Sequence, residues 1–386
     1  MSAGSEYEQL LSRPGAGVLE RAGGNGDKGG LDEDLLVGEL INDIHYLEDR
    51  LGEHADPEIL ARLIDGAEHG LQEVAHHGAE ARLDRRDLAG LEAVVHSDGS
   101  RPVLFVEDDF IDVRAPAAAN FAAALSRVED EVRIACQAAG RVNDPGSLLG
   151  YQGTAWAIGE GVVVTNYHVL EAVTTNAFRA NGVFTGALKP GIAVDFGAEV
   201  GGGPPDRRFP VRRVLAVGPP GAPEHTHPTL PGINFDGLDL AVLELGEVSG
   251  QSFPTPVEVA RGDDPATHGA LASRGRSIYV VGFPGNPAST TPDVFGSLFA
   301  GVKGVKRLTP GLLSQGRGEV ENDPRRWIIG HDSSTLGGSS GSLVVDLEAE
   351  GRLVLGLHFA GLPGRVNWAH GLEGATSELA AVLPGQ

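Results

Sequence analysis

The chain has 386 residues, which is enough for two domains with ordinary cores or for one large domain. Apolar residues make up 41% of it, and no apolar run approaches the roughly 20 residues of a membrane-spanning helix, so we expect no membrane association. The net charge of −23 disfavours non-specific binding to nucleic acid, and most of it lies before residue 150, where 30 acidic residues oppose 13 basic ones.

The N-terminus and the cysteine content point to an intracellular protein. The first residues, MSAGSEYEQLLSRPGAG, lack the basic start, apolar core and cleavage site of a secretory signal, so we expect a cytoplasmic location. Cys136 is the single cysteine, which excludes an intrachain disulfide and agrees with a reducing compartment. It continues the apolar face of an expected helix, which favours a buried residue over a reactive thiol.

The N-terminal region is expected to be helical after a flexible tail. Residues 1–30 are rich in glycine, serine and charge without an apolar period, which predicts disorder. From residue 31 two apolar stripes at helical spacing predict two antiparallel helices, and a third is expected over 82–95. Asp56 can cap the second helix, and Pro57 suits its first turn. We therefore expect a small all-α domain over 31–100.

Residues 101–149 are expected to link this domain to the rest of the chain. The stretch RPVLFVEDDFIDV, 101–113, has the pattern of a short extended segment. NFAAALSRVEDEVRIACQ, 120–137, has the spacing of one amphipathic helix. GRVNDPGSLLG, 140–150, is rich in turn-forming residues and predicts a junction.

Beyond residue 150 the pattern becomes that of an all-β domain. Short runs rich in valine, isoleucine, leucine and threonine alternate with glycine, proline and aspartate clusters, which predicts a sandwich or a pair of small barrels. The clearest of these runs are GTAWAI, GVVVT, RRVLAV, LDLAVLEL, SIYVVGF, WIIG, GSLVVD and RLVLGLHFA.

Three elements of this domain could together perform nucleophilic catalysis. A serine nucleophile needs a base, a carboxylate that orients the base, and N–H groups for the oxyanion. His168 follows an apolar run in GVVVTNYHVLEAV, Asp239 opens DLAVLEL, and the loop GGSSGS comes third. Taken alone, each motif has a simpler interpretation: TNYHV as a surface histidine after a strand, LDLAVLEL as a plain strand and GGSSGS as a flexible turn. Their order, with a strand pattern beside each, favours a Ser-His-Asp site.

Residues 150–386 resemble a trypsin-like serine peptidase of the chymotrypsin fold. GTAWAIGEGVVVTNYHV is similar to the family's histidine motif, LDLAVLEL to its aspartate motif and GGSSGSLVV to its nucleophile loop. The resemblance implies an all-β domain of two six-stranded barrels over 150–386, preceded by the small all-α domain. It further implies hydrolysis of protein or peptide substrates through an acyl-enzyme, without cofactor or metal.

The resemblance also assigns roles. Ser340 corresponds to the nucleophile, with Ser339 and Ser342 as small neighbours, and His168 corresponds to the base. Asp239 is preferred to its neighbour Asp236, because the Asp-Leu-Ala-Val-Leu run matches the family pattern. The backbone N–H groups of Gly338 and Ser340 would form the oxyanion hole. The paired histidines His225 and His227 lack accompanying ligands, so a solvated loop is expected there rather than a metal site.

The substrate preference is read from three positions. Ser334 stands six residues before Ser340, where trypsin-type specificity uses a carboxylate, so a preference for arginine or lysine is not expected. Thr335 and His358 are similar to residues of the bacterial glutamyl-endopeptidase branch that bind an acidic side chain. A hydroxyl donor and an imidazole could pair with a carboxylate, so acidic P1 residues are the expected substrates.

The helical region suggests regulation. The segment RPVLFVEDDF and the helix after it resemble the leader of bacterial intracellular trypsin-like peptidases fused to adaptor domains. The peptidase region also lacks the IVGG start whose new amine activates digestive zymogens. The hypothesis is that the acidic helices, 31–100, bind a protein partner or restrain the peptidase.

The sequence leaves two rival functions open. One is a catalytically silent, protease-like module that binds peptides without cutting them. The other is an esterase or another acyl hydrolase. The second requires a strand-to-helix turn at the nucleophile, whereas Ser340 is followed by the strand-like SLVVD.

Overall fold

The computed structural model describes residues 32–52, 54, 56–97, 101–180, 183–203, 207–227, 233–260, 271–284, 302–335, 339–348, 350–362 and 366–375, with positions 4, 7, 8 and 11. Most of the expected tail, 1–30, therefore lies outside the described residues, as does Gly338. Within the described part, no helix is both long enough and apolar enough to cross a bilayer.

From residue 32 to residue 97, the described residues of the N-terminal region form α3 (Glu33–Leu51), α4 (Pro57–His77) and α5 (Arg85–Ser97). The start of α4 is as predicted, because the Asp56 side chain accepts a hydrogen bond from the Glu58 N–H at 2.9 Å and Pro57 is the first helical residue. Helices α4 and α5 touch through their backbones, since a Cβ at Gly90 would lie 2.0 Å from the Ala67 nitrogen. The shared core contains Val37, Leu40, Ile44, Leu63, Leu71, Val74, Leu91 and Val94.

The linking segment is more regular than its sequence suggests. Residues 101–113 form a hairpin of β1 (Leu104–Glu107) and β2 (Phe110–Ile111), whose turn has positive φ at Asp108 and Asp109. The expected helix over 120–137 is instead two helices, α6 (Ala122–Arg127) and α7 (Glu129–Ala138). They are separated at Val128, whose φ of −119° and ψ of 32° leave the helical region.

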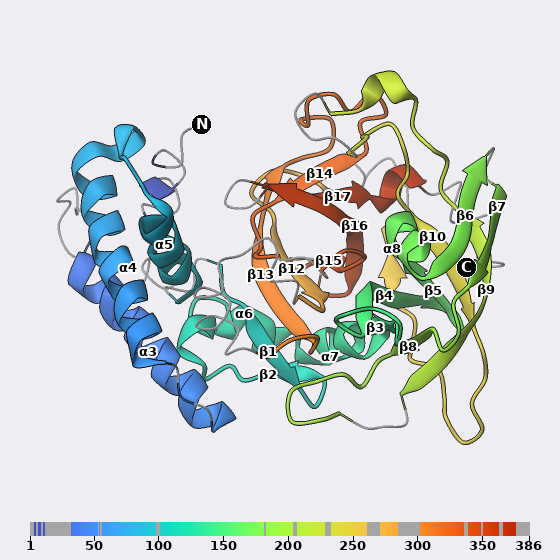
Figure 1. The fold of residues 1–386 in the computed structure, drawn as a ribbon, viewed down its shortest axis with the longest axis horizontal. Coiled ribbons are helices and arrows are strands. Elements are labelled where there is room, and N and C mark those ends of the chain that lie inside the picture. The colour runs from blue at the N-terminus through green and yellow to red at the C-terminus, as the bar shows by residue number, and fades with distance from the viewer. Residues whose placement is uncertain are drawn as a thin grey trace.

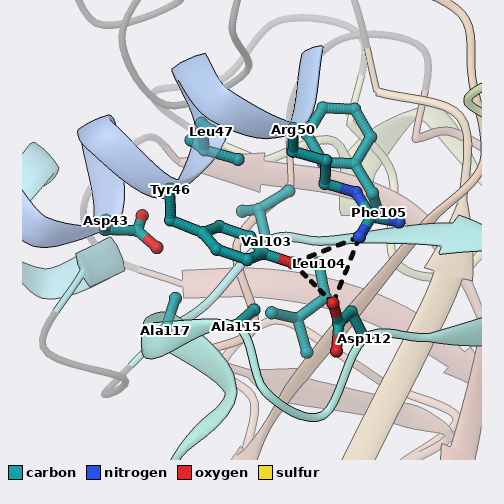
Figure 2. A pocket seen from close by; sticks show the side chains of 10 residues that line it. All are labelled: Asp43, Tyr46, Leu47, Arg50, Val103, Leu104, Phe105, Asp112, Ala115 and Ala117. Atoms are coloured by element: carbon teal, nitrogen blue, oxygen red, sulfur yellow. Dashed lines mark hydrogen bonds and ion pairs between the residues drawn. The ribbon is translucent and has the colours of Figure 1, made fainter.

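The helical region is docked on this linker. The Tyr46 hydroxyl of α3 donates to Asp112 Oδ2 at 2.9 Å, and Arg50 Nη1 donates to the same oxygen at 3.2 Å (Figure 2). A small pocket remains beside this contact, where α3 faces the linker, and it is lined by Asp43, Tyr46, Leu47, Arg50, Val103, Leu104, Phe105, Asp112, Ala115 and Ala117 (Figure 2). The bundle therefore lies next to the second barrel described below, on the side away from the first barrel (Figure 1).

The first barrel is closed by six antiparallel strands in the order β10-β5-β4-β3-β8-β9. They are β3 (Ala139–Asn143), β4 (Tyr151–Gly159), β5 (Val162–Thr165), β8 (Ala193–Asp195), β9 (Arg208–Val217) and β10 (Ala241–Leu245). The junction predicted over 140–150 thus begins with a strand, β3, which pairs with β4 and β8. Helix α8 (Tyr167–Ala172) follows β5, and β6 (Thr174–Ala180) and β7 (Val183–Leu188) form a separate hairpin.

The second barrel is closed in the order β12-β15-β16-β17-β14-β13, with β13 pairing back to β12. Its strands are β12 (Ser277–Gly282), β13 (Arg307–Gln315), β14 (Ile328–His331), β15 (Leu343–Asp346), β16 (Leu353–Leu362) and β17 (Val366–Gly371). Strand β1 of the linker extends this sheet by pairing with β13, and β11 (Glu258–Val259) pairs with β16. The expected two-barrel, chymotrypsin-like fold preceded by helices is confirmed (Figure 1).

Short 3-10 helices complete the described elements: η1 (Gly78–Glu80), η2 (Pro116–Ala118), η3 (Pro223–His225) and η5 (Leu372–Ala375).

A buried ion cluster ties the linker to both barrels. Lys306 Nζ, at the start of the second barrel, lies 2.8 Å from Glu199 Oε1 of the first, and Glu199 Oε2 accepts the Asp109 N–H at 3.2 Å. The linker is thus built into the two-barrel unit.

Candidate active site

His168 and Asp239 meet at the adjacent ends of two paired strands. His168 lies in α8, directly after β5, and Asp239 lies two residues before β10. Because β5 and β10 pair in antiparallel fashion, with Ala241 opposite Thr165, these ends lie side by side. His168 Nδ1 is 2.6 Å from Asp239 Oδ2, and the His168 backbone N–H donates to Asp239 Oδ1 at 3.0 Å. The carboxylate therefore fixes the ring through its Nδ1 edge.

The charges of this pair support each other. Burial by itself lowers the pKa of His168, but the Asp239 carboxylate outweighs burial, so the pKa lies above its ordinary value. Burial likewise raises the pKa of Asp239, but His168 and its hydrogen bonds hold that pKa below the ordinary value. The His168 side chain remains 44% exposed, so its other edge is open to a reacting molecule.

The backbone of Asp239 is held from both sides. Its carbonyl accepts a hydrogen bond from Asn166 Nδ2 at 2.8 Å, and its N–H donates to His370 Nε2 at 3.1 Å. The rival carboxylate, Asp236, is engaged elsewhere, because it accepts the Ala222 N–H and pairs with Arg325 at 3.0 Å. The geometry therefore places Asp239 at His168, as the sequence motif suggested.

The loop that carries Ser340 is fastened to the first barrel. The Ser340 carbonyl accepts the Thr154 N–H at 2.8 Å, and Thr165 Oγ1 donates to the Thr154 carbonyl at 2.6 Å. Gly341 adopts a φ of +85°, and a Cβ there would lie 2.0 Å from the Thr154 oxygen. Only glycine fits this turn, because a side chain would be strained and would also clash.

Ser340 lies beside helix α8. A Cβ added to Gly153 would be 2.8 Å both from the Ser340 oxygen and from Val169 Cγ2, so these groups flank the same glycine. Val169 directly follows His168 in α8, so the serine loop lies against the helix that carries the histidine. Ser340 is half-buried, and its hydroxyl has no hydrogen-bond partner among the described residues. The predicted oxyanion donor Gly338 lies outside the described residues.

The candidate specificity residues lie on the second barrel next to this loop. The His358 N–H donates to the Ser342 carbonyl, and the His358 carbonyl accepts the Gly341 N–H, both at 2.9 Å. His358 Nδ1 lies 3.2 Å from His331 Nε2. Burial and the neighbouring histidines, His331 first, hold the pKa of His358 well below its ordinary value, so this imidazole is neutral at neutral pH.

Thr335 and Ser334 are also hydrogen-bonded. Thr335 Oγ1 donates to Asn367 Oδ1 at 2.6 Å, and Asn367 Nδ2 donates to the Ser333 carbonyl at 2.8 Å. Ser334 Oγ donates to the carbonyl of Arg101 at 3.0 Å. Because Arg101 precedes β1, this bond attaches residues 333–335 to the linker.

A cleft opens beside His168 and Asp239. Its apolar lining comes from the β6–β7 hairpin, from the segment before Asp239 and from the end of β16, and includes Ala177, Phe178, Ile233, Phe359 and Ala360. Glu171 and Arg179 supply charge at its wall, and Arg179 lies 3.9 Å above the Tyr167 ring. The cleft thus borders the His168–Asp239 pair, whereas Ser340, Thr335 and His358 are not among its lining residues in the described part of the chain.

Sequence reasoning missed three supporting residues. Asn166 lies inside the TNYHV motif, where a polar residue at a strand end was a usable signal. His370 and Asn367 lie in β17, whose sequence VNWAHG alternates weakly, so nothing local indicated that they face the site.

The buried thiol of Cys136 agrees with its expected packing role, and burial raises its pKa to about 12.

Comparison with known proteins identifies the family. Residues 153–357, more than half of the chain, match the model of the trypsin-like peptidase domain. A probable serine protease of Lysobacter enzymogenes is 30% identical over 335 residues, which cover 83% of this chain and 82% of the relative. This share exceeds the length from residue 150 to the C-terminus, so the similarity extends into the N-terminal region.

Solved structures with a similar chain path include two proteases. The inactive form of the Rv3671c protease has a TM-score of 0.37 at 16% identity, covering 67% of this chain and 95% of that one. The MamO protease domain of Magnetospirillum magneticum, in its apo form, has a TM-score of 0.35 at 17% identity, with coverages of 64% and 97%. From the family match and the relative of Lysobacter, the chain belongs to the trypsin-like peptidase family.

Proposed function

We propose that this protein is a serine endopeptidase that cuts peptide bonds through His168, Asp239 and Ser340. The observation that carries the proposal is the 2.6 Å contact of His168 Nδ1 with Asp239 Oδ2, in a site where the Ser340 loop lies beside the same helix. Membership of a peptidase family and the open edge of His168 support the same reaction. Protein or peptide chains are then the substrates.

The reaction follows from the roles of these groups. His168 Nε2 takes the Ser340 proton as the hydroxyl attacks the peptide carbonyl, and His168 then protonates the leaving amine. Asp239 holds the Nδ1–H tautomer and stabilises the imidazolium that forms. Water hydrolyses the resulting acyl-enzyme in a second round of the same transfers. The hydrogen bond from Ser340 Oγ to His168 Nε2 would form when substrate binds, because catalytic hydrogen bonds in enzymes without substrate are often long.

The oxyanion is stabilised by backbone donors in this proposal. The N–H groups of Ser340 and Gly338 would point at the oxygen on which negative charge develops. Gly341 contributes indirectly, because its left-handed conformation turns the chain at this point. Losing one such donor typically lowers the rate by about 10²- to 10³-fold.

An acidic P1 side chain is the proposed preference. The positions that would surround it carry a serine, a threonine and a histidine, and thus no carboxylate that would repel an acid. Thr335 Oγ1 would turn from Asn367 toward the substrate carboxylate, and the Nε2 edge of His358, opposite its contact with His331, would donate to it. Such a carboxylate would also favour the protonated form of His358, against the burial that now disfavours it.

The helical region is proposed to regulate the peptidase or to bind a protein partner. Its docking through Tyr46, Arg50 and Asp112 onto the linker provides a physical route, because the same linker carries β1 and the Arg101 contact with Ser334. Deleting residues 1–100 should then change peptidase activity or partner capture. Unchanged activity together with unchanged capture would contradict both roles.

The function is tested by hydrolysis of peptides that differ only at P1, with glutamate, glutamine, alanine or lysine there. The wild-type protein should cleave after glutamate with the highest kcat/KM, and Ser340→Ala should abolish cleavage of every peptide. Cleavage that favours lysine would overturn the acidic preference alone. Binding of peptides without any cleavage by the wild-type protein would instead favour the silent binding module.

A further inference from the structure

We infer that His370 is a positioning residue of the proposed catalytic site, which holds Asp239 in place by accepting its backbone N–H. This inference rests on the proposed function, because it concerns the orientation of the carboxylate that steers His168. The bond spans the two barrels, since Asp239 precedes β10 of the first and His370 lies in β17 of the second.

The position of the His370 ring is fixed by its surroundings. The residue is fully buried, and its ring stacks on Phe359 with centroids 4.1 Å apart and an interplanar angle of 21°. The Trp327 ring packs edge-on against the His370 ring, with the two ring centroids 6.1 Å apart. The imidazole therefore has little freedom to turn, and its Nε2 atom stays directed at the Asp239 N–H.

The chemistry of the contact specifies one form of the ring. Since the Asp239 N–H is a donor, His370 Nε2 must carry no proton, so the ring is neutral with its proton on Nδ1. Burial lowers the pKa of His370 to about 4, which agrees with a neutral acceptor at neutral pH. Nδ1 itself is buried without a hydrogen-bond partner in the described part of the chain.

That orphaned atom argues against a purely packing role. A buried polar atom without a partner is unfavourable, and an apolar side chain of similar size would fill the same space without it. The gain that offsets it is the bond of the opposite ring nitrogen to Asp239. The histidine is therefore explained by what its Nε2 atom holds.

The remaining bonds of Asp239 show why this one matters. The carboxylate is held by His168 and the carbonyl by Asn166, and both of these residues belong to the first barrel. Among the hydrogen bonds of Asp239 in the described part of the chain, the one to His370 reaches the second barrel, which also carries Ser340. A bond of this kind fixes the carboxylate relative to the barrel of the nucleophile.

The test compares two replacements of similar length. His370→Gln keeps an oxygen that can accept the Asp239 N–H, whereas His370→Met has no comparable acceptor. Ile328→Ala is the matched control, because Ile328 is buried opposite His370 on β14 and has no hydrogen bond to Asp239. All variants are assayed at a temperature where circular dichroism shows them folded.

We expect His370→Met to lower kcat by about 10²-fold, because a small misplacement of a catalytic group costs about this much. KM should stay within about two-fold, and His370→Gln should regain at least about ten-fold of the loss. Ile328→Ala should reduce thermal stability with little change in kcat. A kcat for His370→Met equal to that of Ile328→Ala, or no gain for His370→Gln, would overturn the inference.

A second readout does not depend on activity. Amide hydrogen exchange of the segment containing Asp239 should be about ten-fold faster in His370→Met than in the wild type, and should slow again in His370→Gln, because the bond protects this amide. Equal exchange in all three proteins would contradict the inference. An inactive wild-type protein with the expected exchange pattern would contradict the proposed function alone.

Discussion

The carbonyl of Ser340 accepts a hydrogen bond from the Thr154 N–H at 2.8 Å, which ties the loop of the second barrel to strand β4 of the first. His168 and Asp239 belong to the first barrel, so in the proposed mechanism this bond would help to hold the serine loop in register with them. It also explains the tight turn at Gly341, whose neighbouring space is filled by the Thr154 carbonyl.

Replacing Asp239 should impair catalysis far more than replacing its neighbour. Asp239→Asn would leave the shape of the site but favour the wrong His168 tautomer, so kcat should fall by about 10⁴-fold. Asp236→Asn is the control, because Asp236 pairs with Arg325 and should change kcat little. Steady-state kinetics with one peptide measures both, and equal effects of the two variants would contradict the assignment of Asp239.

Activity should rise with pH as His168 loses its proton and becomes a neutral base. The base must be neutral to accept the Ser340 proton, and Asp239 holds the pKa of His168 above 6.5 despite the opposing effect of burial. The half-maximum of kcat/KM is therefore expected above pH 6.5. A pH profile of kcat/KM, which reports groups of the free enzyme, checks this. A half-maximum clearly below pH 6.5 would be incompatible with the pairing.

Gly341→Ala should destabilise the protein more than another glycine replacement at a similar φ. Gly341 and Gly250 have φ values of +85° and +81°, but a Cβ at Gly250 meets no atom within 4 Å, whereas one at Gly341 would clash with Thr154. Gly250→Ala should cost about 1–2 kcal/mol of unfolding free energy, and Gly341→Ala clearly more. Urea unfolding measures both free energies of unfolding. Equal losses in the two variants would show that the clash with Thr154 adds nothing to the cost of the positive φ.

Breaking the buried Lys306–Glu199 pair should loosen the linker from the barrels. Glu199→Leu leaves the fully buried Lys306 with Asp109 at 3.9 Å and removes the acceptor of the Asp109 N–H, so unfolding free energy should fall by about 3–5 kcal/mol. Glu244→Gln, which affects an exposed pair with Arg212, is the control and should cost at most about 1 kcal/mol. Similar unfolding curves for the two variants would contradict a structural role for the cluster.

The sequence predicted the strands whose apolar residues form clear runs. Those around 153–158, 161–165 and 277–283 are present as β4, β5 and β12. Strand β13 was harder to recognise, because Pro310 and Gly311 lie inside it and normally indicate a turn. Its place in the barrel comes from pairing with β12, β14 and β1, which local propensity does not encode.

The residues of the candidate site also differ in how far the sequence predicted them. His168, Asp239 and the serine loop were recognisable because each lies in a short motif beside a strand. His370 lies 131 positions from Asp239 and meets it only when both barrels have closed. The contact of Arg101 with Ser334 likewise depends on β1 joining the second barrel. Contacts between distant segments of this kind have no local sequence signal.

Ser340, among the three serines of GGSSGS, is the proposed nucleophile. Treatment with a fluorophosphonate probe, followed by mass spectrometry of the labelled peptide, locates the modified residue directly. The proposal predicts one adduct, on Ser340, that disappears in Ser340→Ala and in the base variant His168→Ala but persists in Ser339→Ala. An adduct on Ser339 or Ser342, or labelling that survives Ser340→Ala, would contradict it.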